Sequence, residues 1–553
     1  MVLNVAARRI PPALALLLWC ALGTALVQLV LARAAPNPHG FSPIFWYLLT
    51  AYDAHGNLLL GAIVVLAFLL RRQDAVTGLV RFAADHPWRV AAIAFPLLAA
   101  GAATVYRGYP LSMDEYVVWF QAQAFAAGRL DGQFPPELMN ELMPRFPPGF
   151  FFVASRPAGL ITGSYYPGFA LFVTPFAWLG APWAANALVS ALSLPAVHRL
   201  ALAVTGSREA AGWALLLTLA SPVFVVSALS YYAMPAHLLC NVVFALLLLQ
   251  PTPARAALAG LVGSIALTLH NPAPHLLFGA AFVAWLALRR APLAVFASLA
   301  AGYLPLVALL GWGWQQHLVE VLAHSGEAAR QAAGTPAERL GTGAAGALAL
   351  PGARIIEARI AGLSKVWTWG SAGLMVLAAY GFATARAQPA VRTLAAALAI
   401  TFAAYFVVRF DQGHGWGFRY LHSAWFVLPV LAGLALARMD DAETRNFAGW
   451  ALALSLVLAN GLRVAQADSF IGKHLAQVPP LARAADPGRP EVVFLNLTAG
   501  AYTRDMHQND PLLRGGRIVL AYDGPAAAAA LMARRFPDYT RRADGKWGEL
   551  WTR

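Results

Sequence analysis

The chain has 553 residues, of which 59% are hydrophobic and only 12% are charged, and its mean hydropathy is +0.58. Soluble domains carry about 25% charged residues, so this composition excludes the soluble globular class. The net charge of +14 comes from arginines in short groups between apolar runs, a pattern that argues against a nucleic-acid partner and fits cytoplasmic loops lying against a lipid bilayer.

The first 106 residues predict three membrane spans. Arg8 and Arg9 precede a first span at about 11–32 and place the N-terminus in the cytoplasm. A second span ends at Leu70 before a basic loop, and a third covers about 89–106. We therefore interpret residues 1–88 as two N-terminal transmembrane helices followed by a basic cytoplasmic loop.

The first half of the second span contains polar residues, namely Asp53, His55 and Asn57. Polar groups inside a bilayer are costly and usually face the protein interior. This span is therefore expected to be tilted and lined with polar groups, or to begin late.

An adjacent pair of acids opens the first large outer loop, 107–182. Asp114 and Glu115 follow the third span directly and begin a helix. One interpretation is structural, because Ser112 and Glu115 have the spacing of a capping box and acids favour a helix N-terminus. Capping needs only one of these groups, and acids at a membrane interface favour a functional role. We therefore predict Asp114 and Glu115 as catalytic residues.

The rest of this loop combines prolines, charges and aromatic residues. Arg156 lies near the return to the membrane and is a candidate for binding phosphate. Tyr165 and Tyr166 come next, either as cavity residues or as part of the interfacial aromatic belt. The apolar segment Phe169–Leu179 is too short to cross a bilayer, which predicts an interfacial helix.

The remaining membrane part predicts ten more spans and a second outer loop at 314–368. The spans are expected at about 183–204, 210–229, 233–250, 256–270, 273–289, 291–313, 369–385, 391–408, 421–437 and 447–464. Basic residues recur at the ends that face the cytoplasm, so the orientation is consistent along the chain. The total is about thirteen spans, an odd number that puts the C-terminus outside. We treat 89–465 as the main membrane module.

Other polar candidates lie on the outer side. Tyr232 and His237 occupy one turn and His270 another, although interfacial aromatics, satisfied histidines and tight turns would also explain them. Arg354 and Lys365 are cations in the second outer loop, where they could hold a phosphate.

A denser group lies at 411–422, with the sequence DQGHGWGFRYLH. Glycines allow the backbone to approach a ligand closely. Arg419 could bind a phosphate in bidentate fashion and Trp416 could stack on a sugar, with His414 and Tyr420 beside them. A solvated turn would need only glycine and aspartate. The mixture therefore favours a donor-binding role.

The composition becomes that of a soluble region at about residue 466. The segments EVVFLNL and GRIVLAYDG each predict a short buried strand, and PAAAAALMARRF predicts a helix. We therefore expect 466–553 to form a small α/β region outside the membrane, with little functional content.

Several of these segments resemble the GT-C superfamily of membrane glycosyltransferases, in the branch of lipid A aminoarabinose transferases and protein O-mannosyltransferases. They are Asp114-Glu115 with AFAAGRLDGQ, the run from SYYPGF to VHRLALAVTG, and the turn GHGWGFRYLH. The resemblance covers about 100–440 in organisation, through short motifs. The acid pair follows the third span here, whereas the family places it after the first, so the first two spans resemble an N-terminal addition. The turn before His237 also lacks the Ser-His-Pro of some relatives.

The resemblance implies an all-α polytopic enzyme of a bacterial inner membrane that moves a sugar from a polyprenyl phosphate to a periplasmic hydroxyl. The acceptor could be lipid A, another envelope glycan or a protein. Asp114 would take the acceptor proton, and Arg419, with Lys365, Arg354 or Arg156, would stabilise the leaving phosphate. Direct attack would invert the anomeric centre. Glu115 would orient the acceptor. Whether the acid pair binds Mg²⁺ or Mn²⁺ stays open, because family members differ in metal use.

Two other classes of protein stay open as alternatives. A transporter or flippase of a lipid-linked glycan predicts charges at mid-membrane depth and internal symmetry, whereas here the charges gather at the outer face and no repeat is evident. A non-catalytic scaffold for envelope assembly is opposed by the acid pair and by the group at 411–422.

Overall fold

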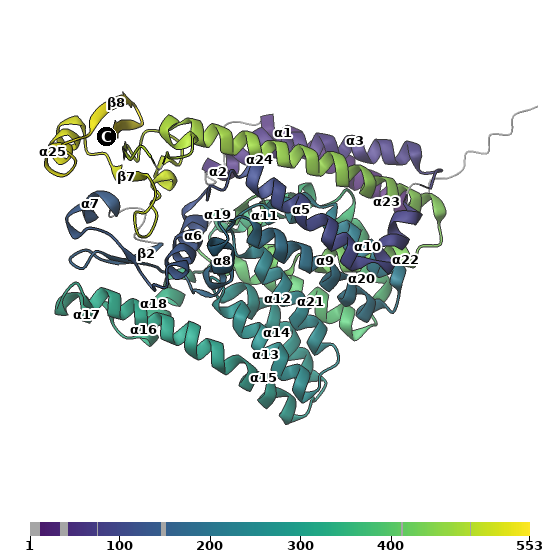
Figure 1. Cartoon of the computed structure of the whole chain (residues 1–553). Coiled ribbons are helices and arrows are strands. Elements are labelled where there is room, and N and C mark those ends of the chain that lie inside the picture. The colour runs from purple at the N-terminus through teal and green to yellow at the C-terminus, as the bar shows by residue number, and fades with distance from the viewer. Residues whose placement is uncertain (1–11, 34–42, 75, 145–150, 411–412, 487) are drawn as a thin grey trace, which may run out of the picture.

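Bundled apolar helices form the body of the molecule, and a small mixed sheet lies at one end (Figure 1). The computed structural model describes residues 12–33, 43–74, 76–144, 151–410, 413–486 and 488–553. Helices suit the apolar composition because a helix satisfies every backbone group internally, which lipid cannot do.

Among the described residues, six helices are long and apolar enough to cross a membrane: Ile44–Leu70, Pro87–Val105, Ala184–Thr205, Leu293–Ala323, Pro389–Val407 and Ala442–Ala476. A seventh candidate is the pair α10 (Arg208–Leu219) and α11 (Pro222–Ala228), which are bent by 60° at the break before Pro222. Shorter apolar helices lie among them: Leu14–Leu26, Gly168–Trp178, Met234–Leu248, Pro253–Thr268, Ala273–Leu288, Leu374–Ala385 and Val427–Ala437. The chain is an integral membrane protein, and the continuous span expected at 210–229 is broken because proline removes a helical hydrogen bond.

The remaining elements follow in chain order. The helices are α1 (Pro12–Arg33), α2 (Pro43–Leu48), α3 (Ala54–Leu70), α4 (Thr77–Asp85), α5 (Pro87–Val105), α6 (Met113–Ala126), α7 (Met139–Leu142), α8 (Gly168–Trp178), α9 (Ala184–Thr205), α12 (Met234–Leu248), α13 (Pro253–Thr268), α14 (Ala273–Leu288), α15 (Leu293–Leu306), α16 (Gly313–Ala323), α17 (Glu327–Ala333), α18 (Pro336–Ala347), α19 (Ala353–Thr368), α20 (Leu374–Ala385), α21 (Pro389–Ala404), α22 (Val427–Ala437), α23 (Ala442–Leu454), α24 (Asn460–Ala476) and α25 (Pro525–Arg535). The strands are β1 (Gly132–Gln133), β2 (Phe152–Ser155), β3 (Leu160–Gly163), β4 (His414–Gly415), β5 (Gly417–Phe418), β6 (Glu491–Leu495), β7 (Arg517–Ala521), β8 (Thr540–Gly545) and β9 (Gly548–Thr552). Short π-helical turns join α2 to α3, α15 to α16 and α23 to α24.

The two outer loops predicted from sequence are folded structures. The first contains α6, a small sheet of order β1-β3-β2, and α8, the expected short apolar helix. The second begins inside a continuous helix, Leu293–Ala323, because a π-turn carries α15 directly into α16. Helices α17 to α19 make up most of the remainder, so this loop is mostly helical.

The C-terminal region is a four-stranded sheet of order β7-β6-β9-β8 with α25. The two strands expected from sequence are β6 and β7, which pair in parallel, and the helix is α25; these predictions are confirmed. The hairpin of β8 and β9 was not predicted, because β8 reads TRRADG and is exposed along its whole length. A strand without buried alternate positions gives no hydrophobic pattern.

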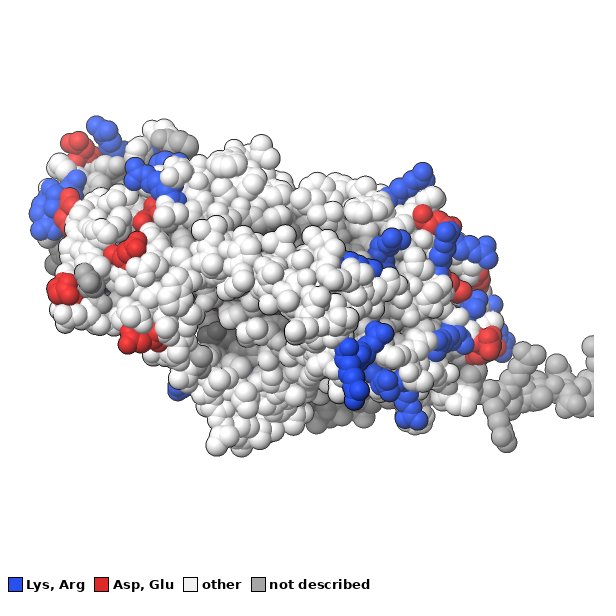
Figure 2. Space-filling model, turned by 90° about the horizontal axis from the view of Figure 1, so that it is seen from below, with Lys and Arg blue, Asp and Glu red and all other residues white. Residues whose placement is uncertain are grey.

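On one face of the molecule the charged side chains leave the middle uncharged (Figure 2). Figure 2 shows Lys, Arg, Asp and Glu toward the two ends of the face seen from below, with an uncharged band between them. Large apolar side chains such as Trp19, Leu97 and Val457 are exposed on the helices. An uncharged belt with exposed apolar side chains is what a lipid-facing surface requires.

Candidate functional site

The acid pair lies in the first turn of α6, just beyond the end of α5. Ser112 precedes the helix in an extended conformation, but its side chain accepts no capping hydrogen bond. Glu115 Oε2 instead lies 3.2 Å from Leu111 N and 3.3 Å from Ser112 Oγ, and its Oε1 lies 3.0 Å from Tyr231 N. The fully buried Glu115 therefore joins α6 to the distant turn at Tyr231, and the expected capping box is not formed.

Asp114 makes a different set of contacts. Its Oδ2 accepts a hydrogen bond from Arg419 Nη2 at 3.0 Å, and its Oδ1 accepts one from Tyr165 OH at 2.5 Å. The side chains of Asp114 and Arg419 are 17% and 19% exposed. This ion pair is thus reachable from outside, although the two residues are 305 positions apart in the sequence.

Aromatic side chains surround the Asp114–Arg419 pair. The Arg419 guanidinium lies 4.2 Å from the ring centroid of Tyr232, whose hydroxyl is 2.9 Å from Ser112 Oγ. The rings of Tyr165 and His270 meet edge to face at 4.1 Å. A cation over an aromatic face is stabilised by the ring quadrupole. Five of the residues predicted from sequence therefore converge from four separate segments: Asp114, Tyr165, Tyr232, His270 and Arg419.

The environment changes the protonation of these groups in opposite directions. Burial acts to raise the pKa of Asp114, but the charge of Arg419 and the hydrogen bonds from Tyr165 and Arg419 outweigh it and hold this pKa below its ordinary value. Burial raises the pKa of Glu115 to about 7, against the opposing hydrogen bond from Tyr231 N–H. Burial lowers the pKa of His270 to about 4, which leaves this imidazole neutral at pH 7.

The group at 411–422 divides between the site and the core. Arg419 reaches Asp114, whereas Trp416 is buried and donates its indole N–H to Tyr106 OH at 2.7 Å. Tyr420 stacks on Tyr405 with ring centroids 4.3 Å apart. Asp411, Gln412 and the side chain of His414 lie outside the described residues.

The other predicted cations lie away from Asp114. Lys365 is fully buried and donates to Asp53 Oδ2 at 2.7 Å. Arg156 donates to the backbone carbonyls of Met139 and Met143 at 2.9 Å and 2.6 Å. Arg354 is exposed in the first turn of α19.

Two further predicted residues also point elsewhere. Tyr166 packs with Trp314 and Leu318 of α16 rather than with Asp114. His237 is buried in α12, and within the part of the chain that the structure describes neither of its ring nitrogens has a hydrogen-bond partner.

The C-terminal region packs directly on the acid loop, which the sequence did not indicate. Tyr116 OH of α6 donates to Asn509 O and accepts from Asn509 N, both at 2.7 Å. Gln508 Nε2 donates to Pro110 O at 2.8 Å. Burial and the charge of Asp114 raise the pKa of Asp505 to about 7, against a hydrogen bond from the backbone of Met113.

Asp505 therefore belongs to the surroundings of the site, although it was not predicted. The only sequence signal is a short polar stretch between two strands, TRDMHQND, in a region that the sequence predicted to have little functional content.

The acid pair does not form a cation centre in this geometry. Asp114 is occupied by Arg419 and Tyr165, and Glu115 faces Tyr231 and Leu111. The two carboxylates thus accept from different donors and do not converge on one point. No group of three or more His, Cys, Asp or Glu that could hold a metal ion occurs among the described residues.

A second charge cluster is enclosed beside α19, and we call it the core cluster. It consists of Asp53, Lys365 and Arg463, with 0%, 0% and 2% of their side chains exposed. Asp53 accepts from Lys365 at 2.7 Å, from Arg463 at 3.1 Å and from the indole of Trp369 at 2.8 Å. Asp53 is the last residue of the π-turn Leu49–Asp53. The polar lining expected for this span is therefore an internal ion network.

Comparison with solved structures shows the fold. The crystal structure of ArnT from Cupriavidus metallidurans bound to undecaprenyl phosphate matches with a TM-score of 0.53 and 12% identity, over 83% of this chain and 97% of that chain. The apo crystal structure of ArnT from the same organism gives a TM-score of 0.47 and 13% identity over the same shares. No protein-family model and no curated protein matches the sequence. The chain has the fold of ArnT, which confirms the resemblance in fold that the sequence predicted.

Proposed function

We propose that the chain is a glycosyltransferase that moves a sugar from a polyprenyl-phosphate donor to a hydroxyl group on the outer side of the membrane. The observation that carries this proposal is the partly exposed Asp114–Arg419 pair, walled by Tyr165, Tyr232 and His270. It places a proton acceptor and an anion binder in contact, at the outer end of α5. The likeness in fold to an ArnT crystallised with undecaprenyl phosphate supports the class of donor.

Arg419 is the group that we assign to the donor phosphate. A guanidinium can bind a carboxylate and a phosphate oxygen at once through separate N–H groups. An arriving phosphate would share Arg419 with Asp114, and this sharing would weaken the interaction that holds the pKa of Asp114 low. Donor binding would thus make Asp114 a stronger base.

Asp114 then acts on the acceptor. The acceptor oxygen attacks the anomeric carbon and forms a new C–O bond while the bond from that carbon to the phosphate oxygen breaks. The electron pair leaves with the polyprenyl phosphate, which Arg419 stabilises, and the acceptor proton passes to Asp114. A single displacement of this kind inverts the anomeric centre. Glu115 positions α6 rather than touching substrate, and no step passes through a metal.

The same proposal includes an orientation in the membrane. Thirteen spans would be reached if the shorter apolar helices other than α8 also cross, with the N-terminus inside and the C-terminal sheet outside. Arginine-rich connections then face the cytoplasm and the acid pair faces the periplasm of a bacterial inner membrane. We divide the chain into 1–88, 89–465 and 466–553 accordingly.

Sugar transfer in proteoliposomes tests the proposal. Full-length protein is supplied with labelled polyprenyl-phosphate sugars and an envelope extract containing lipid A, glycans and proteins as acceptors. Asp114→Asn should lower the rate by about 10²–10⁴-fold, the usual contribution of a general base, while the thermal unfolding midpoint stays within a few degrees of wild type. Asp131→Asn is the matched control, because Asp131 is another acid of the first outer loop held by a side-chain contact, with Oδ1 2.8 Å from His317 Nε2.

The outcomes separate the classes of function. Transfer by wild type and by Asp131→Asn but not by Asp114→Asn supports the proposal. Equal transfer by all three proteins would remove Asp114 from the mechanism. Movement of labelled lipid across the bilayer without any sugar transfer would indicate a flippase instead of an enzyme. Absence of both sugar transfer and lipid movement would favour a non-catalytic scaffold.

A further inference from the structure

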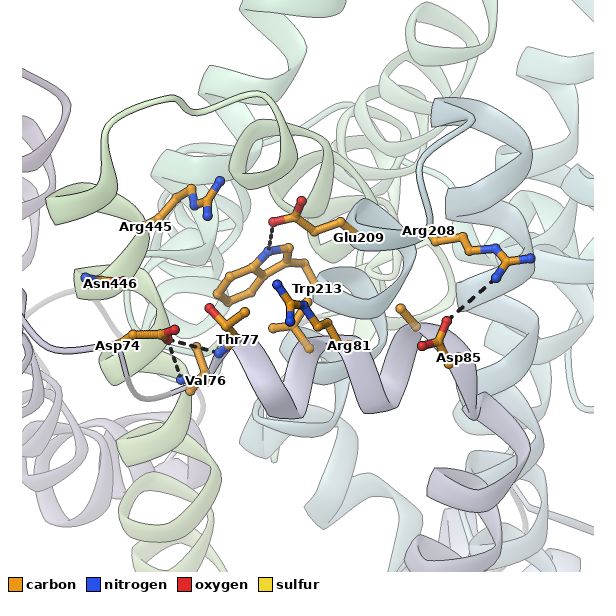
Figure 3. A pocket seen from close by; sticks show the side chains of 12 residues that line it. Asp74, Val76, Thr77, Arg81, Asp85, Arg208, Glu209, Trp213, Arg445 and Asn446 are labelled. Atoms are coloured by element: carbon orange, nitrogen blue, oxygen red, sulfur yellow. Dashed lines mark hydrogen bonds and ion pairs between the residues drawn. The ribbon is translucent and has the colours of Figure 1, made fainter.

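A polar pocket of about 240 Å³ lies at the end of the molecule opposite the acid pair (Figure 3). The 19-residue helix α5 separates the two places, since it begins two residues after Asp85 and ends shortly before Asp114. The pocket is formed by the turn before α4, one face of α4, the start of α10 and the start of α23. The proposed transferase activity makes no use of it.

The pocket contains equal numbers of opposite charges. Its charged lining residues are Arg81, Arg208, Arg445, Asp74, Asp85 and Glu209. Figure 3 shows them distributed around the rim and centre, with the indole of Trp213 beneath Arg81. A binding surface with both signs of charge complements a ligand that is itself zwitterionic.

Part of this charge is not neutralised internally. Among the described residues, the side chains of Arg81 and Arg445 form no hydrogen bond or ion pair (Figure 3), although the charge of Arg445 helps to lower the pKa of Asp74. Arg208 and Asp85 lie 3.7 Å apart and are largely exposed, a weak pairing. Asp74 is the exception, because it accepts hydrogen bonds from the backbone of Val76 and Thr77. Glu209 Oε1 accepts a hydrogen bond from the indole of Trp213 at 3.4 Å (Figure 3). The guanidinium groups of Arg81 and Arg445 therefore remain available to a ligand, and the Glu209 and Asp85 carboxylates keep further lone pairs for one.

The walls of the pocket are fixed by close packing. A Cβ at Gly212 would lie 2.6 Å from Val80 O, so glycine at this position lets α4 pack closely against α10. His198 Nε2 lies 3.0 Å from Ala84 O and holds the other end of α4 to α9. On the opposite wall Trp450 donates to Gln73 O at 3.0 Å. The pocket is thus preformed, which lowers the entropic cost of binding.

In the topology proposed above, the pocket lies at the depth of the lipid headgroups. The apolar helices α3, α5 and α9 all begin or end around it. Trp88, at the start of α5, is 65% exposed, as expected of an aromatic residue at a membrane interface. A lipid headgroup can therefore reach the pocket without leaving its leaflet.

We propose that this pocket binds the headgroup of an aminophospholipid such as phosphatidylethanolamine. The phosphate lies between Arg81 and Arg445, and the ammonium group faces Glu209 and Asp85. A purely anionic headgroup would place negative charge near these two carboxylates, offset only by the weak pairing of Asp85 with Arg208 and the hydrogen bond from Trp213 to Glu209. In the topology proposed above the lipid comes from the cytoplasmic leaflet, but the binding itself does not depend on transferase activity.

Native mass spectrometry of the full-length protein in detergent tests this site. Phosphatidylethanolamine and phosphatidylglycerol with identical acyl chains are titrated separately and in competition. Wild type should prefer phosphatidylethanolamine by at least fivefold, and the variant Arg81→Gln/Arg445→Gln should bind it at least tenfold more weakly. The control Arg386→Gln/Arg392→Gln removes two exposed arginines outside the pocket and should change nothing.

The acid side of the pocket gives a sharper result. Asp85→Asn/Glu209→Gln should reverse the preference toward phosphatidylglycerol, because the carboxylates that attract ammonium and repel a bare anion are gone. O-phosphoethanolamine and inorganic phosphate serve as soluble competitors. Displacement of lipid by millimolar O-phosphoethanolamine but not by phosphate supports headgroup recognition, and displacement by phosphate alone would instead assign a free-phosphate site.

Three results would overturn the proposal. They are equal binding of the two lipids by wild type, equal losses in the pocket and control variants, and an unchanged preference after neutralisation of the acids. Thermal unfolding of each variant shows whether a loss of binding reflects a loss of fold. If both pocket variants were unfolded, the thermal unfolding of wild type with each lipid would decide the question. Greater stabilisation by phosphatidylethanolamine than by phosphatidylglycerol would support the proposal, and equal stabilisation would contradict it.

Discussion

Two carboxylate–arginine clusters in this molecule use the same chemistry for different ends. At the candidate site Asp114 pairs with Arg419 at 3.0 Å, and in the core cluster Asp53 pairs with Arg463 at 3.1 Å. The site pair is 17% and 19% exposed, whereas the core cluster is closed to solvent. The two clusters therefore differ in their exposure to solvent and not in the distances between their charged atoms.

The two clusters also differ in how many hydrogen-bonding groups remain free to bind a ligand. Asp53 accepts from two cations and an indole, so both its oxygens are used inside the protein. Among the described residues, the Arg419 side chain donates one hydrogen bond, to Asp114, and lies over the ring of Tyr232, which leaves other N–H groups for a ligand. A closed cluster can only stabilise the fold, while an open one can exchange partners. We expect mutations in the two clusters to separate stability from activity.

The largest expected effect is the loss of the core cluster's single acid. Asp53→Asn would leave Lys365 and Arg463 buried without a counter-ion, which costs about 3–5 kcal/mol for a broken buried pair. We expect little folded protein in detergent, measured by size-exclusion chromatography and thermal unfolding.

A second substitution sharpens this result. In Asp53→Asn/Lys365→Met the core cluster has the same net charge as in the wild type, so this double variant should recover a substantial part of the folded yield. Asp440→Asn, at an exposed acid, is the control and should change stability by less than about 0.5 kcal/mol. Normal folding of Asp53→Asn alone would show that the core cluster does not stabilise the protein.

The next effect is on substrate binding at the open site. Arg419→Lys keeps the charge but loses the planar fork, so KM for the polyprenyl-phosphate sugar should rise about 10–100-fold, as expected for a lost charge-assisted hydrogen bond of about 1.5–3 kcal/mol. Arg354→Gln, at an exposed arginine of α19, should leave KM unchanged. Comparable losses in both variants would assign the phosphate to a wider basic surface rather than to Arg419.

The smallest effect concerns Asp505, where the C-terminal region meets the site. Its pKa of about 7 means that it is mostly neutral at pH 6 and charged at pH 8. Deprotonation adds negative charge beside Asp114, so KM for the anionic donor should rise by roughly three- to fivefold over this range, or about 1 kcal/mol. Glu115 titrates in the same range, since its pKa is also about 7, so Asp505→Asn should reduce the slope of the profile without abolishing it. An unchanged pH dependence of KM in this variant would exclude Asp505 from the site.

Much of the architecture could be predicted from local sequence. The membrane spans, the helix that begins at the acid pair, and strands β6 and β7 all follow from the length and period of apolar runs. The broken helix at Pro222 and the continuation of α15 into α16 were not predicted, because each depends on how neighbouring helices support a bend or a π-turn.

By itself, then, the sequence determined that this is a helical membrane protein with acids and arginines at its surfaces, because the bilayer imposes those requirements on every segment separately. Only the tertiary structure decided which charges meet. Arg419 and Lys365 were both predicted from sequence as phosphate-binding cations, yet one contacts Asp114 and the other is buried against Asp53. The partners are 305 and 312 positions apart, and such pairings depend on the packing of whole helices rather than on any local pattern.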